Sequence, residues 1–160
     1  MAVFWGRFVP ALRPVDFDVP APHPLTLAAW LVLCASPAAL PAGYFRPWAF
    51  ERGRFYPRLG LRVFRRIATD GDWVIRRLRR IDPRYRIVTG RRSLEAHLAG
   101  TITNERWHLA FAIAGFETAG FALITSQYAW ALAIAVLNVA FNAYPVMHQR
   151  YKRARLRHLH

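Results

Sequence analysis

The chain lacks most of the motifs that common enzyme classes need. It has one cysteine in 160 residues, Cys34, which excludes a disulfide within the chain and a metal site built of several thiolates. It has no Gly-rich phosphate loop of the GxxxxGK type and no GxSxG elbow. His97, His108 and His148 have no second histidine or carboxylate at zinc-ligand spacing. We therefore expect no metal and no thiol chemistry.

Acidic residues and lysine are also scarce. Nine acidic residues face 23 basic ones, 22 of them arginine, and the net charge is +14. Such an excess implies an anionic partner, which is nucleic acid, anionic lipid, or an acidic or phosphate-bearing substrate. We expect no nucleic acid, because the arginine-rich stretch lies between apolar segments and matches no known nucleic-acid module. A genome biased toward arginine codons is the alternative explanation of the arginine content.

Apolar residues, by contrast, are plentiful and gathered into three segments. These are Leu25–Leu40, Trp107–Ile124 and Tyr128–Met147. A membrane-spanning helix takes about 20 apolar residues, so the first segment is short, and a helix that continues to Phe45 needs a kink at Pro37 or Pro41. The uncharged turn Thr125-Ser126-Gln127 joins the other two segments. It predicts an antiparallel helical hairpin.

This pattern predicts an all-α integral membrane protein of about three hydrophobic helices with a basic amphipathic interfacial region. The expected divisions are 1–24, an N-terminal segment; 25–45, a first membrane helix; 46–106, a basic cytoplasmic or interfacial region; 107–149, a membrane hairpin; and 150–160, a basic tail. Within the basic region, Asp72–Ile81 has the spacing of an amphipathic surface helix, and Ser93–Leu98 is a second short helix candidate.

The distribution of basic residues predicts the orientation. Sixteen of them fall between Arg46 and Arg106, five between Arg150 and Arg157, and none in the turn. By the positive-inside rule, the basic region and the C-terminus face the cytoplasm. We expect a multi-pass protein of the cell (inner) membrane.

The stretch from Thr101 to His108 carries the first candidate chemistry. If it is helical, Glu105 and His108 lie one turn apart on the same face. Titratable groups are costly at the edge of a membrane, so their presence there points to a function. The pair suits a general base, His108, and an acid that orients it, Glu105.

The hairpin brings further polar residues to the same depth. A turn centred near Ser126 sets His108 level with about Tyr144, so several polar residues from both helices converge at the boundary. These are Glu105, His108, Asn142, Gln149 and Arg150. The alternative is a structural polar cluster that pins the two helices together.

Three blocks of sequence carry a family resemblance. The first is Tyr44-Phe45-Arg46 with Phe50-Glu51, Gly53 and Phe55-Tyr56, followed by Arg62 to Arg66 and Asp70-Gly71. The second is Thr101, Glu105 and His108, in the pattern Thr-x-x-x-Glu-x-x-His. The third is Asn142 with Gln149-Arg150-Tyr151-Lys152-Arg153 and Arg155, close to a Gln-Arg-Tyr-Asn-Arg signature. Together they resemble the glycosyl-4,4'-diaponeurosporenoate acyltransferases of staphyloxanthin-type carotenoid synthesis.

The resemblance implies transfer of a fatty acyl group to a sugar hydroxyl of a glycosylated carotenoid or related glycolipid, among membrane lipids. It implies no bound cofactor, with acyl-CoA or acyl carrier protein as the acyl donor. Together with the spacing argument it assigns the site residues. They are His108 and Glu105 as catalytic residues, and Thr101, Asn142, Gln149, Arg150 and Arg153 as substrate-binding residues.

A second function remains open at this point. Small residues recur along the second apolar segment, as in helices that pack closely within membranes. They are Ala110, Ala112, Ala114, Gly115, Ala119 and Gly120. They fit a non-catalytic accessory subunit of a larger membrane protein complex, which would tolerate a change at His108.

Overall fold

The computed structural model describes residues 24–51, 55–67 and 72–156, and within these ranges every regular element is helical. The elements are α2 (Pro24–Ala35), the 3-10 helices η2 (Ser36–Ala39) and η3 (Ala49–Glu51), α3 (Phe55–Arg58), α4 (Leu61–Ile67), α5 (Asp72–Ile81), α6 (Arg91–Ile124), α7 (Tyr128–Asn138), the π-helix η4 (Val139–Ala143) and α8 (Tyr144–Leu156). The predicted all-α class is confirmed. Residues 1–23 of the predicted N-terminal segment and residues 157–160 of the predicted tail lie outside the described ranges.

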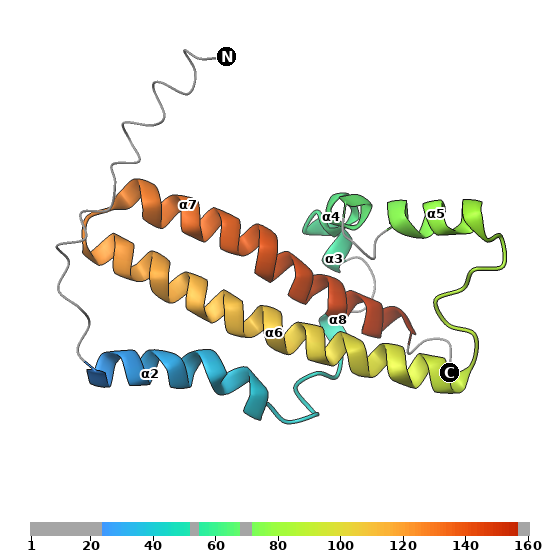
Figure 1. Cartoon of the computed structure of the whole chain (residues 1–160), viewed down its shortest axis with the longest axis horizontal. Helices are drawn as coiled ribbons and strands as arrows, with labels where there is room; N and C mark the ends of the chain where they lie inside the picture. The colour runs from blue at the N-terminus through green and yellow to red at the C-terminus, as the bar shows by residue number, and fades with distance from the viewer. Residues whose placement is uncertain (1–23, 52–54, 68–71, 157–160) are drawn as a thin grey trace, which may run out of the picture.

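The predicted C-terminal hairpin is confirmed. Helix α6 lies antiparallel to a continuous rod of α7, η4 and α8 (Figure 1). Helix α6 ends at Ile124, and Ser126 in the following turn has φ 60°. The Ser126 N–H donates to the Leu123 carbonyl at 3.0 Å. The Gln127 N–H donates to the Ala122 carbonyl at 2.7 Å. These two bonds satisfy carbonyls that the end of α6 would otherwise leave open, so the turn is fixed at the expected residues.

One expectation about α6 needs correction. The sequence predicted a short helix at Ser93–Leu98 and a separate membrane segment that begins at Trp107. The structure has one helix of 34 residues over both. No proline interrupts this stretch, and Gly100 alone costs only about 1 kcal/mol in a helix. The basic region is therefore joined rigidly to the apolar segment, and Glu105 and His108 do share a helix.

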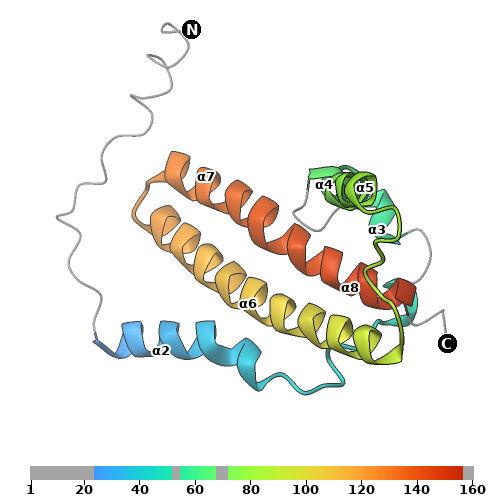
Figure 2. The same ribbon diagram turned by 45° about the vertical axis from the view of Figure 1, so that its right-hand side comes forward.

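Helix α2 packs along α6 on the side away from α7 (Figures 1 and 2). The described part of this helix runs from Pro24 to Ala35. Pro37 lies in the following 3-10 turn, so helical structure stops at Ala39, short of the expected Phe45. The Cys34 thiol donates a 3.4 Å hydrogen bond to Glu117 of α6 and joins the two helices within the apolar layer.

The short helices gather at the other end of the hairpin. Helix α4 packs on α8, where the Phe64 ring stacks on Tyr144 with centroids 5.6 Å apart. The Tyr144 hydroxyl donates to the Leu59 carbonyl at 3.0 Å. Helix α5 has the predicted bounds and follows α4 on the face of the hairpin that α2 does not cover (Figure 2).

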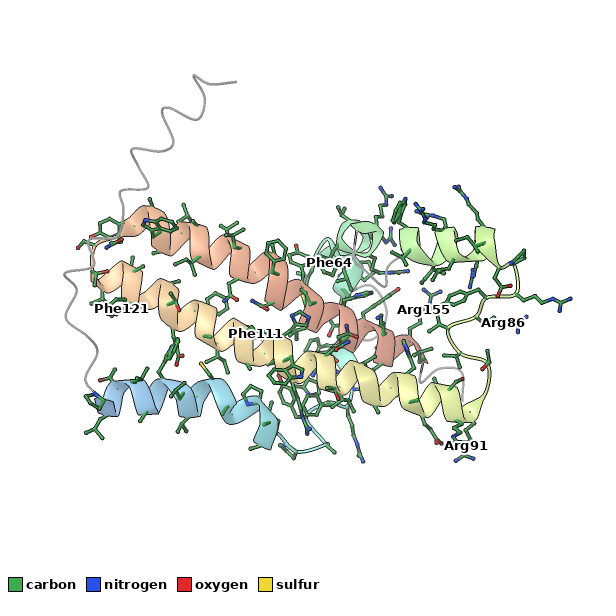
Figure 3. All side chains as sticks on the ribbon, in the orientation of Figure 1. Phe64, Arg86, Arg91, Phe111, Phe121 and Arg155 are labelled. Atoms are coloured by element: carbon green, nitrogen blue, oxygen red, sulfur yellow. The ribbon has the colours of Figure 1, made fainter. Side chains whose placement is uncertain are left out.

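Two helical rods are long and apolar enough to cross a membrane, Arg91–Ile124 with 34 residues and Tyr128–Leu156 with 29. Few residues of either apolar stretch are buried inside the protein. Phe111 and Phe121 lie along the part of α6 that leads to the turn, whereas Arg86, Arg91 and Arg155 lie at the opposite end (Figure 3). Charge and apolar surface are thus separated along the axis of the hairpin.

Candidate functional site

A buried cluster of charges joins α6 to α8. Glu105 of α6 has no exposed surface, and its two carboxylate oxygens pair with two arginines of α8. Oε1 lies 3.0 Å from Nη1 of Arg150, and Oε2 pairs with Nη2 of Arg153. The arginines are three residues apart, so they lie on one face of α8. A single carboxylate therefore bridges consecutive turns of the partner helix.

A second carboxylate, Glu51 of η3, completes the cluster. It accepts bonds from Arg150 Nε at 2.5 Å, from the Tyr56 hydroxyl at 2.7 Å and from the Trp48 N–H at 2.9 Å. Burial acts to raise the pKa of Glu51, but the hydrogen bonds from Arg150, Tyr56 and the backbone outweigh it and hold that pKa below its usual range. Burial and the bond to Glu51 raise the pKa of Tyr56, which keeps its hydroxyl a donor. Two carboxylates thus balance two guanidinium groups.

Backbone carbonyls of the loop before η3 accept further hydrogen bonds from the guanidinium groups of Arg150 and Arg153. Arg150 donates to the carbonyls of Tyr44 at 3.2 Å and Arg46 at 3.4 Å. Arg153 donates to the carbonyl of Phe45 at 3.0 Å. The loop is thereby tied to both long helices through the same two side chains.

A hydroxyl and an aromatic ring close the remaining sides of the cluster. Arg153 Nη1 donates to Thr101 Oγ1 at 3.2 Å, and Thr101 in turn donates to the Leu98 carbonyl at 2.6 Å. The guanidinium group of Arg150 lies 4.5 Å from the centre of the Trp48 ring, within cation–π range. The cluster is almost sealed, since Arg153 is only 2% exposed.

A separate chain of amides reaches His108. Asn138 Nδ2 donates to the Ala112 carbonyl at 2.8 Å, and Asn142 Nδ2 donates to Asn138 Oδ1 at 2.8 Å. Asn142 Oδ1 then lies 3.3 Å from Nδ1 of the half-buried His108 ring. A backbone carbonyl only accepts, so it fixes the direction of every bond in this chain. This order of donors and acceptors favours the tautomer of His108 in which Nδ1–H donates to Asn142 Oδ1 and the lone pair is on Nε2.

The π-helix η4 places Asn142 in this chain. The Tyr144 N–H bonds to the carbonyl of Val139, five residues earlier. Pro145 follows directly; it has no N–H, and its ring crowds the carbonyl of Phe141 four residues before it. A π turn relieves that crowding, and such turns are frequent at functional sites.

Gly115 makes room for the same chain. A Cβ added at this position would lie 2.5 Å from Asn138 Cγ, well inside van der Waals contact. Any side chain at residue 115 therefore displaces Asn138.

Six of the seven predicted site residues fall into two groups that share α6 and the rod of α7, η4 and α8. Thr101, Glu105, Arg150 and Arg153 form the buried cluster, and His108 contacts Asn142. Gln149 is also buried, and its Oε1 has no hydrogen-bond partner within the described part of the chain. The expected contact of Glu105 with His108 does not form. The His108 ring contacts Asn142, and the Glu105 carboxylate pairs with the two arginines of α8.

Two members of these groups were missed as site residues. Glu51 was noted only as part of a sequence block, although two buried arginines facing one carboxylate require a second negative charge. Asn138 was not assigned, although it lies one turn before Asn142 on the same helical face. In the ranges that the structure describes, no three metal-binding side chains come together.

A comparison with protein-family models gives a match over most of the chain. A family model described as glycosyl-4,4'-diaponeurosporenoate acyltransferase matches residues 41–160, which include both groups of site residues. No curated protein and no solved structure matches the chain. The matched region begins just before the loop whose carbonyls accept hydrogen bonds from Arg150 and Arg153.

The buried cluster predicts a large difference between two glutamates of α6. Glu105→Gln keeps the shape of the side chain but leaves the two arginines with one carboxylate, and losing one partner of a buried pair costs about 3–5 kcal/mol. Glu95→Gln is the matched control, because Glu95 pairs with Arg91 at 3.1 Å while their side chains are 64% and 87% exposed. That change should cost less than about 1 kcal/mol.

The measurement is denaturant or thermal unfolding of the purified proteins in the same detergent. Equal stability of the two variants would show that the cluster contributes no more than a surface pair.

Proposed function

Since the chain belongs to the glycosyl-4,4'-diaponeurosporenoate acyltransferase family, we propose that it is a membrane acyltransferase that acylates a sugar hydroxyl of a glycosylated carotenoid or related glycolipid. The observation that carries the proposal is the His108–Asn142 contact of 3.3 Å. It provides a half-exposed base with its lone pair on Nε2, where the apolar part of α6 begins. A sugar attached to a membrane-held chain would reach this depth.

The proposed reaction uses His108 as the general base. Nε2 removes the proton of the sugar hydroxyl as its oxygen attacks the carbonyl carbon of an acyl thioester, the donor class that acyl-CoA and acyl carrier protein share. A C–O bond forms and the C–S bond breaks, and the leaving thiolate takes the proton back from His108. Asn142 Oδ1 accepts the Nδ1–H throughout and orients the imidazolium, the role first assigned to Glu105.

We propose that Glu105, Arg150 and Arg153 position the site without contacting substrate. Their charged groups are buried and engaged with one another, so a substrate would have to open the cluster to reach them. Glu105 lies one turn before His108 on α6, and Arg150 lies two turns after Asn142 on the same rod. Their ion pairs therefore fix the separation of the base from its partner. Thr101 belongs to this support. Gln149 remains a candidate substrate contact through Oε1, which has no hydrogen-bond partner among the described residues.

We propose that both helices of the hairpin cross a cell membrane with the turn on the outer side. Their length and apolar composition support the crossing. The orientation rests on the 21 basic residues that lie from Arg46 to Arg106 and from Arg150 to Arg157, 16 in the first stretch and five in the second.

Removal of the base should abolish most of the activity. General base catalysis contributes about 10²–10⁴-fold, so His108→Ala should lower acyl transfer by that factor and leave the protein folded, because the ring lies outside the ion-pair cluster. The measurement is acylated glycolipid formed per unit of membrane-inserted protein, by mass spectrometry. A His108→Ala protein that forms product at the wild-type rate would favour the accessory-subunit function instead.

The amide chain predicts a contrast between two glycines of α6. Gly115→Ala places a methyl group against Asn138 and should shift Asn142, and a misplacement near 1 Å costs about 10²-fold in rate. Gly120→Ala is the control, because no atom of the described residues lies within 4 Å of its added Cβ. We expect kcat to fall for Gly115→Ala while KM for the donor is unchanged. Equal activity of the two variants would remove the amide chain from the mechanism.

The orientation can be tested by labelling single cysteines in a Cys34→Ser background. A cysteine at Gln127, in the hairpin turn, should react with an impermeant maleimide added to intact cells. A cysteine at Arg91, the first residue of α6, should react only after the membrane is opened. The reverse labelling pattern would show that the turn faces the cytoplasm.

A further inference from the structure

A small cavity lies on the face of α8 opposite the buried cluster. Its volume is about 160 Å³, and it is partly open to solvent. Residues of α4, α5, the segment between α5 and α6, α6 and α8 line it. Its polar lining comes from six side chains, Arg65, His97, His148, Tyr151, Lys152 and Arg155. Tyr151, Lys152 and Arg155 point away from Arg150 and Arg153 because 100° per residue separates them around the helix. The signature stretch therefore has two faces, and the mechanism proposed above uses only one.

Among the described residues that line this cavity, every charged side chain is basic. Arg65, Lys152 and Arg155 supply three cations, and no carboxylate is among the described residues that line it. Arg65 Nη1 lies 3.3 Å from the Tyr151 hydroxyl, and its guanidinium group lies 5.2 Å from the centre of the Tyr151 ring, so α4 and α8 hold this cation at the wall. Apolar side chains such as Ile75 and Val88 complete the lining, and a lower local dielectric strengthens attraction to an anion.

Size selects the kind of anion. Pockets for drug-sized ligands are about 300–1,000 Å³, so this cavity holds one phosphate group rather than a nucleotide. Arginine side chains match phosphate oxygens with pairs of hydrogen bonds. We propose that the cavity lined by Arg65, Lys152 and Arg155 binds the phosphate group of a phosphate ester.

The position of the cavity is consistent with the acyl donor as the source of the phosphate group. In this respect the inference rests on the proposed function. Tyr151 and Arg155 lie about 14–20 Å along the helix axis from Asn142, at about 1.5 Å per residue. A donor that carries its thioester on a flexible arm could bind its phosphate here and reach His108 with the carbonyl carbon. A phospholipid headgroup would offer the same chemistry from the membrane.

The test measures binding without turnover. Coenzyme A, which carries no acyl group, is titrated calorimetrically into the full-length protein in phosphatidylcholine nanodiscs, and pantetheine, which has no phosphate, is titrated in parallel. Arg155→Gln should weaken coenzyme A binding about 10-fold or more, the effect of losing a charge-assisted hydrogen bond. Arg155 is exposed, so the variant should fold, and its thermal midpoint verifies this. Arg91→Gln is the control, because it removes an exposed arginine elsewhere at the basic end of the hairpin. It should change coenzyme A binding less than about twofold.

A second arm separates the two sources. Native mass spectrometry counts phosphatidylglycerol retained by the wild type and by Arg155→Gln after extraction from mixed nanodiscs. Coenzyme A binding that needs Arg155 identifies the donor as the source, and retention of phosphatidylglycerol that needs Arg155 identifies the lipid; either result supports a phosphate site. If neither ligand binds, or if both bind Arg155→Gln as well as wild type, the site does not exist. His108→Ala should bind as wild type does, so failure of the catalytic proposal is distinguishable from failure of this one.

Discussion

The two ion pairs of Glu105 hold three separate parts of the chain in one place. The carboxylate comes from α6, the guanidinium groups come from α8, and the guanidinium groups in turn hold the loop that carries Glu51. Burying these charges is costly, and their attraction offsets the cost only when geometry and count are both satisfied. A slip of α8 by one turn along α6 would leave Glu105 facing one arginine instead of two. We infer that the cluster specifies register more than it adds stability, and register is what the His108–Asn142 contact requires.

Helix α8 divides its polar residues between two environments. Arg150 and Arg153 face inward and are nearly sealed, while Lys152 and Arg155 face a cavity on the other side. Arginine suits the inward face because one planar group donates several bonds at once, as Arg150 does to two carboxylates and two carbonyls. A run of basic residues after an apolar helix thus combines internal support with an anion-binding surface.

The sequence predicted the parts of the fold that depend on periodicity and on segregation of charge. The hairpin, its turn near Ser126 and the bounds of α5 followed from apolar spacing and from the uncharged turn. The depth argument placed His108 near Asn142, and the structure joins them. The partner of Glu105 was not predictable in this way. Spacing within α6 places His108 near Glu105, and depth in the hairpin places Arg150 near it. Which of the two pairs with the carboxylate depends on the loop that carries Glu51. Glu51 was not assigned for the same reason, since its ion pair with Arg150 joins residues 99 positions apart. The π turn before Pro145 also shifts the helical phase that a regular pattern assumes.

The position of one proton on His108 follows from the backbone of α6. The Ala112 carbonyl can only accept, so Asn138, Asn142 and the imidazole ring are each given one direction of hydrogen bonding. A carboxylate in place of Asn142 would also orient the ring, but it would place a charge beside the apolar layer, where charge is costly. An amide chain orients the proposed base without adding charge, while the carboxylate of Glu105 pairs with Arg150 and Arg153. Orientation and anchoring are therefore divided between two polar groups on the same pair of helices, and a base at the boundary between water and lipid needs both.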